Sequence, residues 1–228
     1  MTSSTVEVSP VQFNARGNGP LLEGYLYHPT GAGRFPAAIA CHPHSLMGGS
    51  MQDAVIVTVC RALAESGWMA LRFNFRGVGD SGGFFSEGRG ELDDVAGALD
   101  FLETQKAADV DRLAVVGYSF GAAVGLRHAA RDQRVGWLVG IALTQANYGD
   151  PFLDHERRPK LFIVGEHDAW APLENLRAYV ARLSPPKTLK VIPQVDHFFS
   201  GRQPEVAVEV ADFLTSGGSL EAKKESSG

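Results

Sequence analysis

The pentapeptide at 117–121, Gly-Tyr-Ser-Phe-Gly, places Ser119 between two glycines. An apolar run at 113–116 precedes it and a small-residue stretch at 122–126 follows, so the pattern predicts a buried strand, a tight turn and a helix. In such a turn the serine hydroxyl projects beyond the sheet at the positive end of the helix dipole. We therefore interpret Ser119 as a nucleophile. The alternative is a glycine-rich turn in which the serine has no chemical role.

A serine hydroxyl is a weak nucleophile unless a base accepts its proton and a carboxylate orients that base. His197 follows the last expected strand, at 188–192, and Asp168 follows the strand before it, at 161–165. Functional residues of parallel sheets gather at the carboxyl ends of the strands. Ser119, Asp168 and His197 are therefore the candidate catalytic residues.

The acid is the least constrained of these three positions. Asp196 adjoins His197, and Glu166 lies two residues before Asp168, so either carboxylate could orient the imidazole instead. Asp168 could also cap the helix that is expected to begin near Pro172, a common role for aspartate in a loop. A single loop histidine is also more often a surface residue than a base. The chain order of the three residues and their places after strands favour the catalytic interpretation.

The oxyanion of a tetrahedral intermediate needs two N–H donors that are in place before the reaction. A serine turn of this kind supplies one from the residue after the nucleophile, here Phe120. The second is expected from the loop after the strand at 35–41. Pro43 has no N–H in that loop, so His44 is the first candidate donor and Ser45 the second.

His42 and His44 are separated by one residue, and imidazoles are common metal ligands. Because no third ligand is placed beside them, a metal site is the weaker interpretation, and His42 is expected to brace the loop through hydrogen bonds. Cys41 and Cys60 match no metal or redox spacing and are expected to be reduced core residues. The sequence therefore predicts catalysis without a metal or another cofactor.

Strands that alternate with helices must position these residues. Two loosely alternating segments separated by a Gly-Asn-Gly-Pro turn predict an antiparallel pair at the start of the chain. The rest predicts an α/β, three-layer αβα sandwich around a mostly parallel sheet, with one domain at 1–215 and a disordered tail at 216–228. The expected strands lie at 5–14, 20–28, 35–41, 68–73, 111–116, 135–143, 161–165 and 188–192, and the expected helices at 50–66, 92–102, 120–131, from about 172, and at 206–214.

The composition is that of a globular protein, since 44% of the 228 residues are hydrophobic and 21% are charged. The net charge is −5, so the composition does not indicate a basic surface of the kind that binds nucleic acid. Residues 1–10 do not resemble a signal peptide, and no apolar run is long enough to span a membrane. We expect a cytoplasmic protein with no nucleic-acid or membrane partner, and homodimer formation is left open.

Five motifs together resemble one family. They are Cys-His-Pro-His at 41–44 with a following Gly-Gly pair, the segment at 72–81, the serine pentapeptide, Gly-Glu-His-Asp at 165–168 and Asp-His-Phe-Phe at 196–199. This set is similar to the small, capless branch of the α/β-hydrolase superfamily, which includes dienelactone hydrolases and prokaryotic carboxylesterases, and it covers roughly residues 8–215. The resemblance implies an eight-stranded, mostly parallel sheet and a Ser-Asp-His mechanism. Ser119 departs from the cysteine of dienelactone hydrolases and favours ester chemistry.

The segment at 144–159 is rich in helix breakers and too short for a cap domain, so we expect an open, shallow site. An apolar wall with a few polar donors suits an acyl chain or an aromatic alcohol. In the glycine-rich loop at 75–90, a tight turn held by Arg76 or Asp80 is favoured over substrate contact. The expected substrate-binding residues are Met47, Trp170 and Phe198, and the other apolar side chains beside the candidate catalytic positions are Phe84, Phe85, Phe120 and Phe199.

We interpret the chain as a serine hydrolase that cleaves carboxylic esters, of short acyl chains, through an acyl-enzyme. A thioesterase, an amidase or an acyltransferase with the same three residues is the first alternative. A binding protein with this fold but without catalysis is the second. The expected partner is a small-molecule ester.

Overall fold

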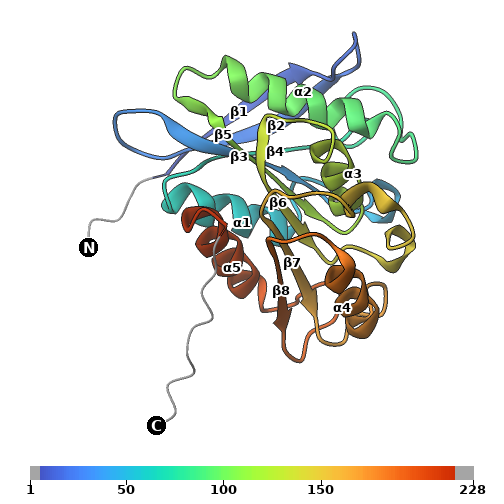
Figure 1. The fold of residues 1–228 in the computed structure, drawn as a ribbon. Coiled ribbons are helices and arrows are strands. Elements are labelled where there is room, and N and C mark those ends of the chain that lie inside the picture. The colour runs from blue at the N-terminus through green and yellow to red at the C-terminus, as the bar shows by residue number, and fades with distance from the viewer. Residues whose placement is uncertain (1–5, 219–228) are drawn as a thin grey trace.

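The computed structural model describes residues 6–218 and shows a central sheet with helices on both faces (Figure 1). Three short 3-10 helices lie in connecting segments: η1 (Ser45–Met47), η2 (Gln145–Asn147) and η3 (Pro151–Leu153). The strands are β1 (Glu7–Asn14), β2 (Leu21–His28), β3 (Phe35–Cys41), β4 (Met69–Phe73), β5 (Ala108–Tyr118), β6 (Val135–Ile141), β7 (Lys160–Gly165) and β8 (Lys187–Ile192), and the α-helices are α1 (Ala54–Glu65), α2 (Glu91–Thr104), α3 (Phe120–Ala129), α4 (Leu173–Arg182) and α5 (Gln203–Thr215).

The eight strands form one sheet in the order β1-β2-β4-β3-β5-β6-β7-β8. β2 pairs antiparallel with both β1 and β4, and every pair from β4 to β8 is parallel. The expected antiparallel start and mostly parallel sheet are thus confirmed. Because β3 and β5 are neighbours at the centre, the loop after β3 and the turn after β5 leave the sheet side by side.

Two apolar layers hold the helices to the sheet. On one face, α1 and α5 pack together and bury residues at helical spacing, such as Val55, Val59 and Leu63 of α1. On the other face, α2, α3 and α4 cover the strands (Figure 1). β5 is buried from Leu113 to Tyr118, as expected for a central parallel strand covered on both sides.

The helix expected at 50–66 begins only at Ala54. Asp53 stops it from starting earlier, because its Oδ1 accepts hydrogen bonds from the N–H groups of Val55 and Ile56 as an N-cap. The helix expected at 120–131 ends at Ala129. These differences lie at element ends, where capping rather than apolar periodicity decides the boundary.

Between β6 and β7 the segment 144–159 contains only η2 and η3, and no cap domain is present there. Residues 216–218 close α5 with a hydrogen-bonded turn, in which Gly218 N–H donates to the Phe213 carbonyl at 2.9 Å. The remainder of the expected tail, 219–228, lies outside the described residues. Among the helices of residues 6–218, none has the length and apolar character needed to cross a bilayer.

Candidate active site

Ser119 occupies a strained turn between β5 and α3. Its φ of 54° and ψ of −114° are unusual for a residue with a side chain, and its N–H donates to the Ile141 carbonyl of β6 at 2.8 Å. A Cβ at Gly117 would lie 2.3 Å from the Gly121 carbonyl oxygen, and one at Gly121 would lie 2.2 Å from the Cys41 carbonyl oxygen. The two glycines therefore let α3 begin directly against β5 and β3, which is the geometric reason for the pentapeptide.

The structure brings the three candidate catalytic residues into one hydrogen-bonded line. Nε2 of His197 lies 2.9 Å from Oγ of Ser119, and Nδ1 of His197 lies 2.7 Å from Oδ2 of Asp168. All three side chains are buried, with Ser119 8% exposed. An imidazole that donates from Nδ1 to the carboxylate presents an unprotonated Nε2 to the serine, as a general base must.

Asp168 also holds its own loop. Its second oxygen, Oδ1, accepts from the N–H groups of Trp170 and Ala171 at 2.9 and 2.7 Å. The first turn of α4 follows at Leu173 and has no side-chain cap, so the aspartate orients the histidine and the turn before the helix at once.

The two alternative acids point elsewhere. Asp196 accepts from the N–H of Phe198, and Glu166 accepts from the N–H of Gln194; both bonds are exposed. Neither carboxylate has a hydrogen bond to His197 in the described structure. The geometry therefore selects Asp168 from the three acids considered.

The loop that carries His197 is tied to the serine strand. Tyr118, next to the nucleophile, donates its hydroxyl to the His197 carbonyl oxygen at 2.8 Å. Burial raises the pKa of the Tyr118 hydroxyl, so it stays protonated and remains a donor. Gly165 lets β7 approach the same loop, since a Cβ there would lie 2.5 Å from the Asp196 carbonyl oxygen. This role of Tyr118 could not be predicted from the sequence, because a tyrosine in this position of the pentapeptide has no distinctive signal.

Two backbone amides remain candidates for binding an oxyanion. Phe120 begins α3, so its N–H has no acceptor within the helix, and neither it nor the His44 N–H has a hydrogen-bond acceptor within residues 6–218. The rings of the two residues lie 5.0 Å apart between centroids. Both residues line the cleft above Ser119, whereas Ser45 does not. This arrangement favours His44 over Ser45 as the second donor.

His42 braces the loop after β3. Its Nε2 accepts from the N–H of Phe75 at 3.1 Å, so its Nδ1 carries the proton and donates to the Pro43 carbonyl at 2.6 Å. Burial lowers the pKa of His42 to about 4, and the ring is neutral at pH 7. Both ring nitrogens are engaged in these bonds. Within the described part of the chain, no three His, Cys, Asp or Glu side chains are grouped to hold a metal ion.

The cleft above Ser119 has a volume of about 670 Å³. The expected contacts Met47, Trp170 and Phe198 line it, and the Trp170 ring meets the His197 ring edge-on at 4.6 Å between centroids. Phe120 lines it as well. The other residues that line the cleft were not predicted from the sequence to do so; they are Pro43, Gly48, Gly49, Asp53, Glu87, Gly88, Tyr118, Ala123, Val124, Arg127, Thr144, Gln145, Ala146 and Asn147.

Three of the aromatic residues expected beside the site do not line the cleft. Phe84 points into solvent and is 87% exposed. Phe85 packs behind the cleft against the rings of His44 and Phe120. Phe199 is buried against Tyr118. The reason is that these loops turn sharply between neighbouring residues, so adjacent aromatic side chains face different directions.

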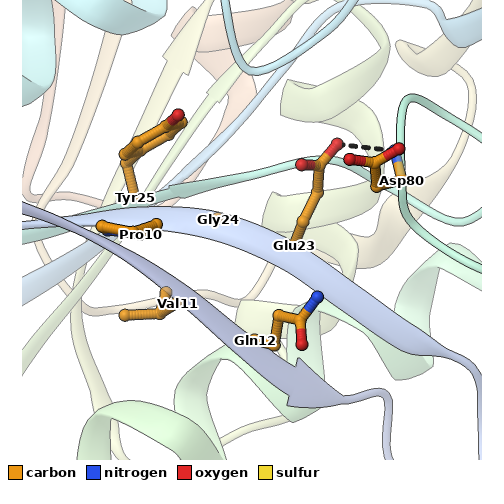
Figure 2. Close-up of a pocket in the computed structure, with 7 residues that line it drawn as sticks. All are labelled: Pro10, Val11, Gln12, Glu23, Gly24, Tyr25 and Asp80. Carbon is orange, nitrogen blue, oxygen red and sulfur yellow. Dashed lines mark hydrogen bonds between the residues drawn. The ribbon is translucent and has the colours of Figure 1, made fainter.

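The loop at 75–90 is held by an ion pair. The backbone N–H, Nε and Nη2 of Arg76 all donate to Asp94 at the start of α2, and the Asp94 side chain is fully buried. Asp80 is held through its backbone, whose N–H donates to the Glu23 carboxylate (Figure 2). Arg76 therefore holds the tight turn of this loop, as predicted from the sequence.

A second hollow of about 500 Å³ lies on the β1–β2 pair, lined by the residues drawn in Figure 2. Its one glutamate, Glu23, already accepts hydrogen bonds from the Asn74 side chain and the Asp80 backbone. None of the candidate catalytic residues reaches it. This hollow therefore takes no part in the arrangement of Ser119, Asp168 and His197.

Known proteins agree with this architecture. A family model described as X-Pro dipeptidyl-peptidase (S15 family) matches residues 18–192. An uncharacterized protein of Rickettsia prowazekii, RP471, is 31% identical over 207 residues, which cover 86% of each chain.

Two solved structures share the fold at a similar level of identity. An alpha-beta serine hydrolase homologue from Coxiella burnetii has a TM-score of 0.79 and 31% identity, covering 90% of this chain and 96% of its own. XC6422 from Xanthomonas campestris, described as an a/b serine hydrolase without lid, has a TM-score of 0.76 and 31% identity, covering 92% and 93%. The chain belongs to the S15 family that the matching model describes, and with it to the α/β serine hydrolases of the α/β-hydrolase superfamily.

Proposed function

We propose that this protein hydrolyses carboxylic esters of short acyl chains through an acyl-enzyme on Ser119. The observation that carries the proposal is the unbroken line of hydrogen bonds from Asp168 through His197 to the Ser119 hydroxyl. The unpaired backbone amides of Phe120 and His44, two residues that line the same cleft, support it. No cofactor takes part in the proposed reaction.

In the first half-reaction, Oγ of Ser119 attacks the ester carbonyl while Nε2 of His197 takes its proton. The carbonyl oxygen becomes an anion, which the N–H groups of Phe120 and His44 stabilise together with the positive end of α3. Collapse of this intermediate breaks the bond to the alcohol, and His197 returns the proton to the leaving oxygen. Asp168 stabilises the imidazolium that exists between these two transfers.

In the second half-reaction, water attacks the acyl-enzyme. His197 takes a proton from the water as the new C–O bond forms, and the same two amides bind the second oxyanion. His197 then gives this proton to Oγ of Ser119 as the bond between Oγ and the acyl carbon breaks, which releases the carboxylic acid. The proton count closes, since His197 begins and ends each half-reaction neutral.

Amide cleavage is the second candidate function, because the matching family model is described as an X-Pro dipeptidyl-peptidase. The same serine, histidine and aspartate serve an amide, but an amine leaves less readily than an alcohol and depends more on proton donation by His197. Thioester cleavage and acyl transfer use the same acyl-enzyme. These reactions differ in leaving group or acceptor, so a substrate panel separates them.

The test begins with labelling by a fluorophosphonate, which reacts with an activated serine whatever the substrate. We expect labelling of the wild type and none of Ser119→Ala. Absence of labelling in the wild type would favour a binding protein without catalysis. A panel of p-nitrophenyl esters, acyl thioesters and Xaa-Pro p-nitroanilides then ranks kcat/KM. We expect the esters of acetate to hexanoate to lead; a lead for the anilides would replace the ester proposal with peptide cleavage.

A further inference from the structure

One stripe of α3 extends the cleft away from the nucleophile. The stripe consists of Phe120, Ala123, Val124 and Arg127, all of which line the cleft. Their spacing, i, i+3, i+4 and i+7, places them on one face of the helix, one turn after another. The cleft therefore continues along α3 for about two turns beyond Ser119.

Two segments form the walls of this groove. On one side Gly88 lies against the stripe, since a Cβ there would be 3.5 Å from Cγ2 of Val124 and 3.7 Å from Cε2 of Phe120. The segment 144–147, which includes η2, also lines the cleft. The floor of the groove is apolar: Ala123, which is 6% exposed, and Val124, which is 1% exposed, offer only methyl groups.

Arg127 stands where the apolar floor ends. Its Nε and Nη2 donate to Oδ2 of Asp150 at 3.2 and 2.8 Å, and its Cζ lies 4.8 Å from the centre of the Phe152 ring. Its Nη2 also lies 3.5 Å from Oδ1 of Asn147. The side chain is only 25% exposed. A guanidinium held in this way cannot move aside without losing its ion pair, so it forms a fixed polar end to the groove.

The groove suits the acyl part of an ester rather than the alcohol. The leaving alcohol must lie next to Nε2 of His197, which gives it a proton, and Trp170 and Phe198 surround that ring. The acyl part lies on the opposite side of the scissile carbonyl. The stripe begins at Phe120, next to the nucleophile, and runs along α3 to Arg127.

We propose that Arg127 determines the longest acyl chain that the site accommodates; this inference rests on the proposed ester hydrolase. From Phe120 to Arg127 the helix rises by about 10 Å, at about 1.5 Å per residue. Helical side chains lean toward the N-terminus of their helix, so the guanidinium of Arg127 covers about one turn of this length. The apolar floor that remains for the acyl chain is therefore roughly 5–7 Å long. An extended chain advances about 1.2 Å per bond, so the groove holds about four to six carbons.

A longer chain meets the guanidinium. Its next methylenes must either desolvate a charged group that is already paired with Asp150 or turn out into water. Neither adds binding energy, whereas each methylene buried on the apolar floor adds about fourfold to kcat/KM. We therefore expect kcat/KM to rise from acetate to butanoate or hexanoate and then to level off or fall.

The test compares alkyl fluorophosphonates that carry a butyl or an octyl chain in place of the acyl group. Their second-order labelling rates report the fit of the chain without depending on which bond the enzyme cleaves. In Arg127→Ala we expect the octyl-to-butyl ratio of labelling rates to rise at least tenfold over wild type. The octanoate-to-butanoate ratio of kcat/KM for p-nitrophenyl esters should rise in parallel.

Arg131→Ala is the matched control, because Arg131 is an exposed arginine one turn further along that does not line the cleft. It should leave the chain-length ratio as in the wild type. An unchanged ratio in Arg127→Ala, in protein that labels normally with the butyl probe, would overturn the role of Arg127 and leave the ester proposal standing. If the proteins label normally and the octyl-to-butyl ratio rises in Arg127→Ala, but the wild type does not turn over the p-nitrophenyl esters, only the ester proposal would be overturned. A wild type that reacts with neither probe would overturn both.

Discussion

Replacing Asp168 with asparagine removes one charge and tests how His197 is oriented. The Oδ1 atom of Asp168 accepts from two backbone N–H groups, those of Trp170 and Ala171. Asparagine can satisfy both only by placing its carbonyl oxygen there. Its NH₂ group then faces Nδ1 of His197, 2.7 Å from the present carboxylate oxygen. Because NH₂ is a donor, Nδ1 must become the acceptor and the imidazole proton must move to Nε2.

That tautomer cannot accept the proton of Ser119. The opposite rotamer of asparagine would keep the correct tautomer, but it would set an NH₂ group against the two backbone donors and leave them unpaired in a buried site. We therefore expect kcat to fall by about 10⁴-fold, the size expected when an imidazole is held in the wrong tautomer. This corresponds to about 5 kcal/mol of lost transition-state stabilisation. The fold should survive, because the hydrogen bonds that hold the loop at Oδ1 remain.

The assay is turnover of p-nitrophenyl butanoate by wild type, Asp168→Asn and Asp196→Asn, with thermal unfolding of each protein as the check on folding. Asp196 accepts only from the exposed N–H of Phe198, so its variant should lose less than tenfold. A loss of less than tenfold in Asp168→Asn, together with a large loss in Asp196→Asn, would refute the reasoning and make Asp196 the acid.

Two further predictions concern residues that support the site. Gly121→Ala would place a Cβ 2.2 Å from the Cys41 carbonyl oxygen, so we expect a loss of more than about 3 kcal/mol in the free energy of unfolding, measured by denaturant titration. Gly136→Ala is its control, since the Cβ there meets nothing closer than 3.7 Å and stability should hardly change. Burial lowers the pKa of His42 to about 4 in the folded protein. Between pH 6.5 and 4 the unfolded chain therefore binds a proton at His42 more readily than the folded protein does. Stability should therefore fall by about 3 kcal/mol from this group as the pH drops from 7 to 4. In His42→Gln, which keeps an acceptor for the Phe75 N–H, that part of the pH dependence should vanish; an equal slope in the variant would contradict it.

The sheet and the positions of the candidate catalytic residues could be predicted because each depends on a short, local pattern. Buried parallel strands appear in the sequence as unbroken apolar runs. Ser119, Asp168 and His197 each follow such a run. Once the strands are parallel and adjacent, their carboxyl ends must meet. His44 likewise follows the apolar run at 35–41, and the structure shows that this strand, β3, pairs with the serine strand β5. No detail of side-chain packing was needed for these inferences.

The lining of the cleft could not be predicted in the same way. Arg127 lies in a helix whose period is visible in the sequence, but which face borders the cleft depends on how Gly88 and 144–147 pack over it. Phe198 and Phe199 show the same limit, because one lines the cleft and the other is buried in the core. A loop has no repeating period from which the direction of each side chain could be derived. Such directions follow only from tertiary contacts.

Residues that carry no proton in the proposed reaction hold the parts of the site in place. Ser119 sits in a backbone conformation that costs energy, and such a conformation persists only where its surroundings hold it. Gly117 and Gly121 allow that close packing, Tyr118 ties the histidine loop to the serine strand, and His42 fixes the loop that offers the second amide. Each of these bonds joins segments that are distant in sequence. The positions of the nucleophile, the base and the oxyanion donors are therefore set by the packing of the sheet's carboxyl edge, and a change at any of these supports should lower kcat without removing a reacting group.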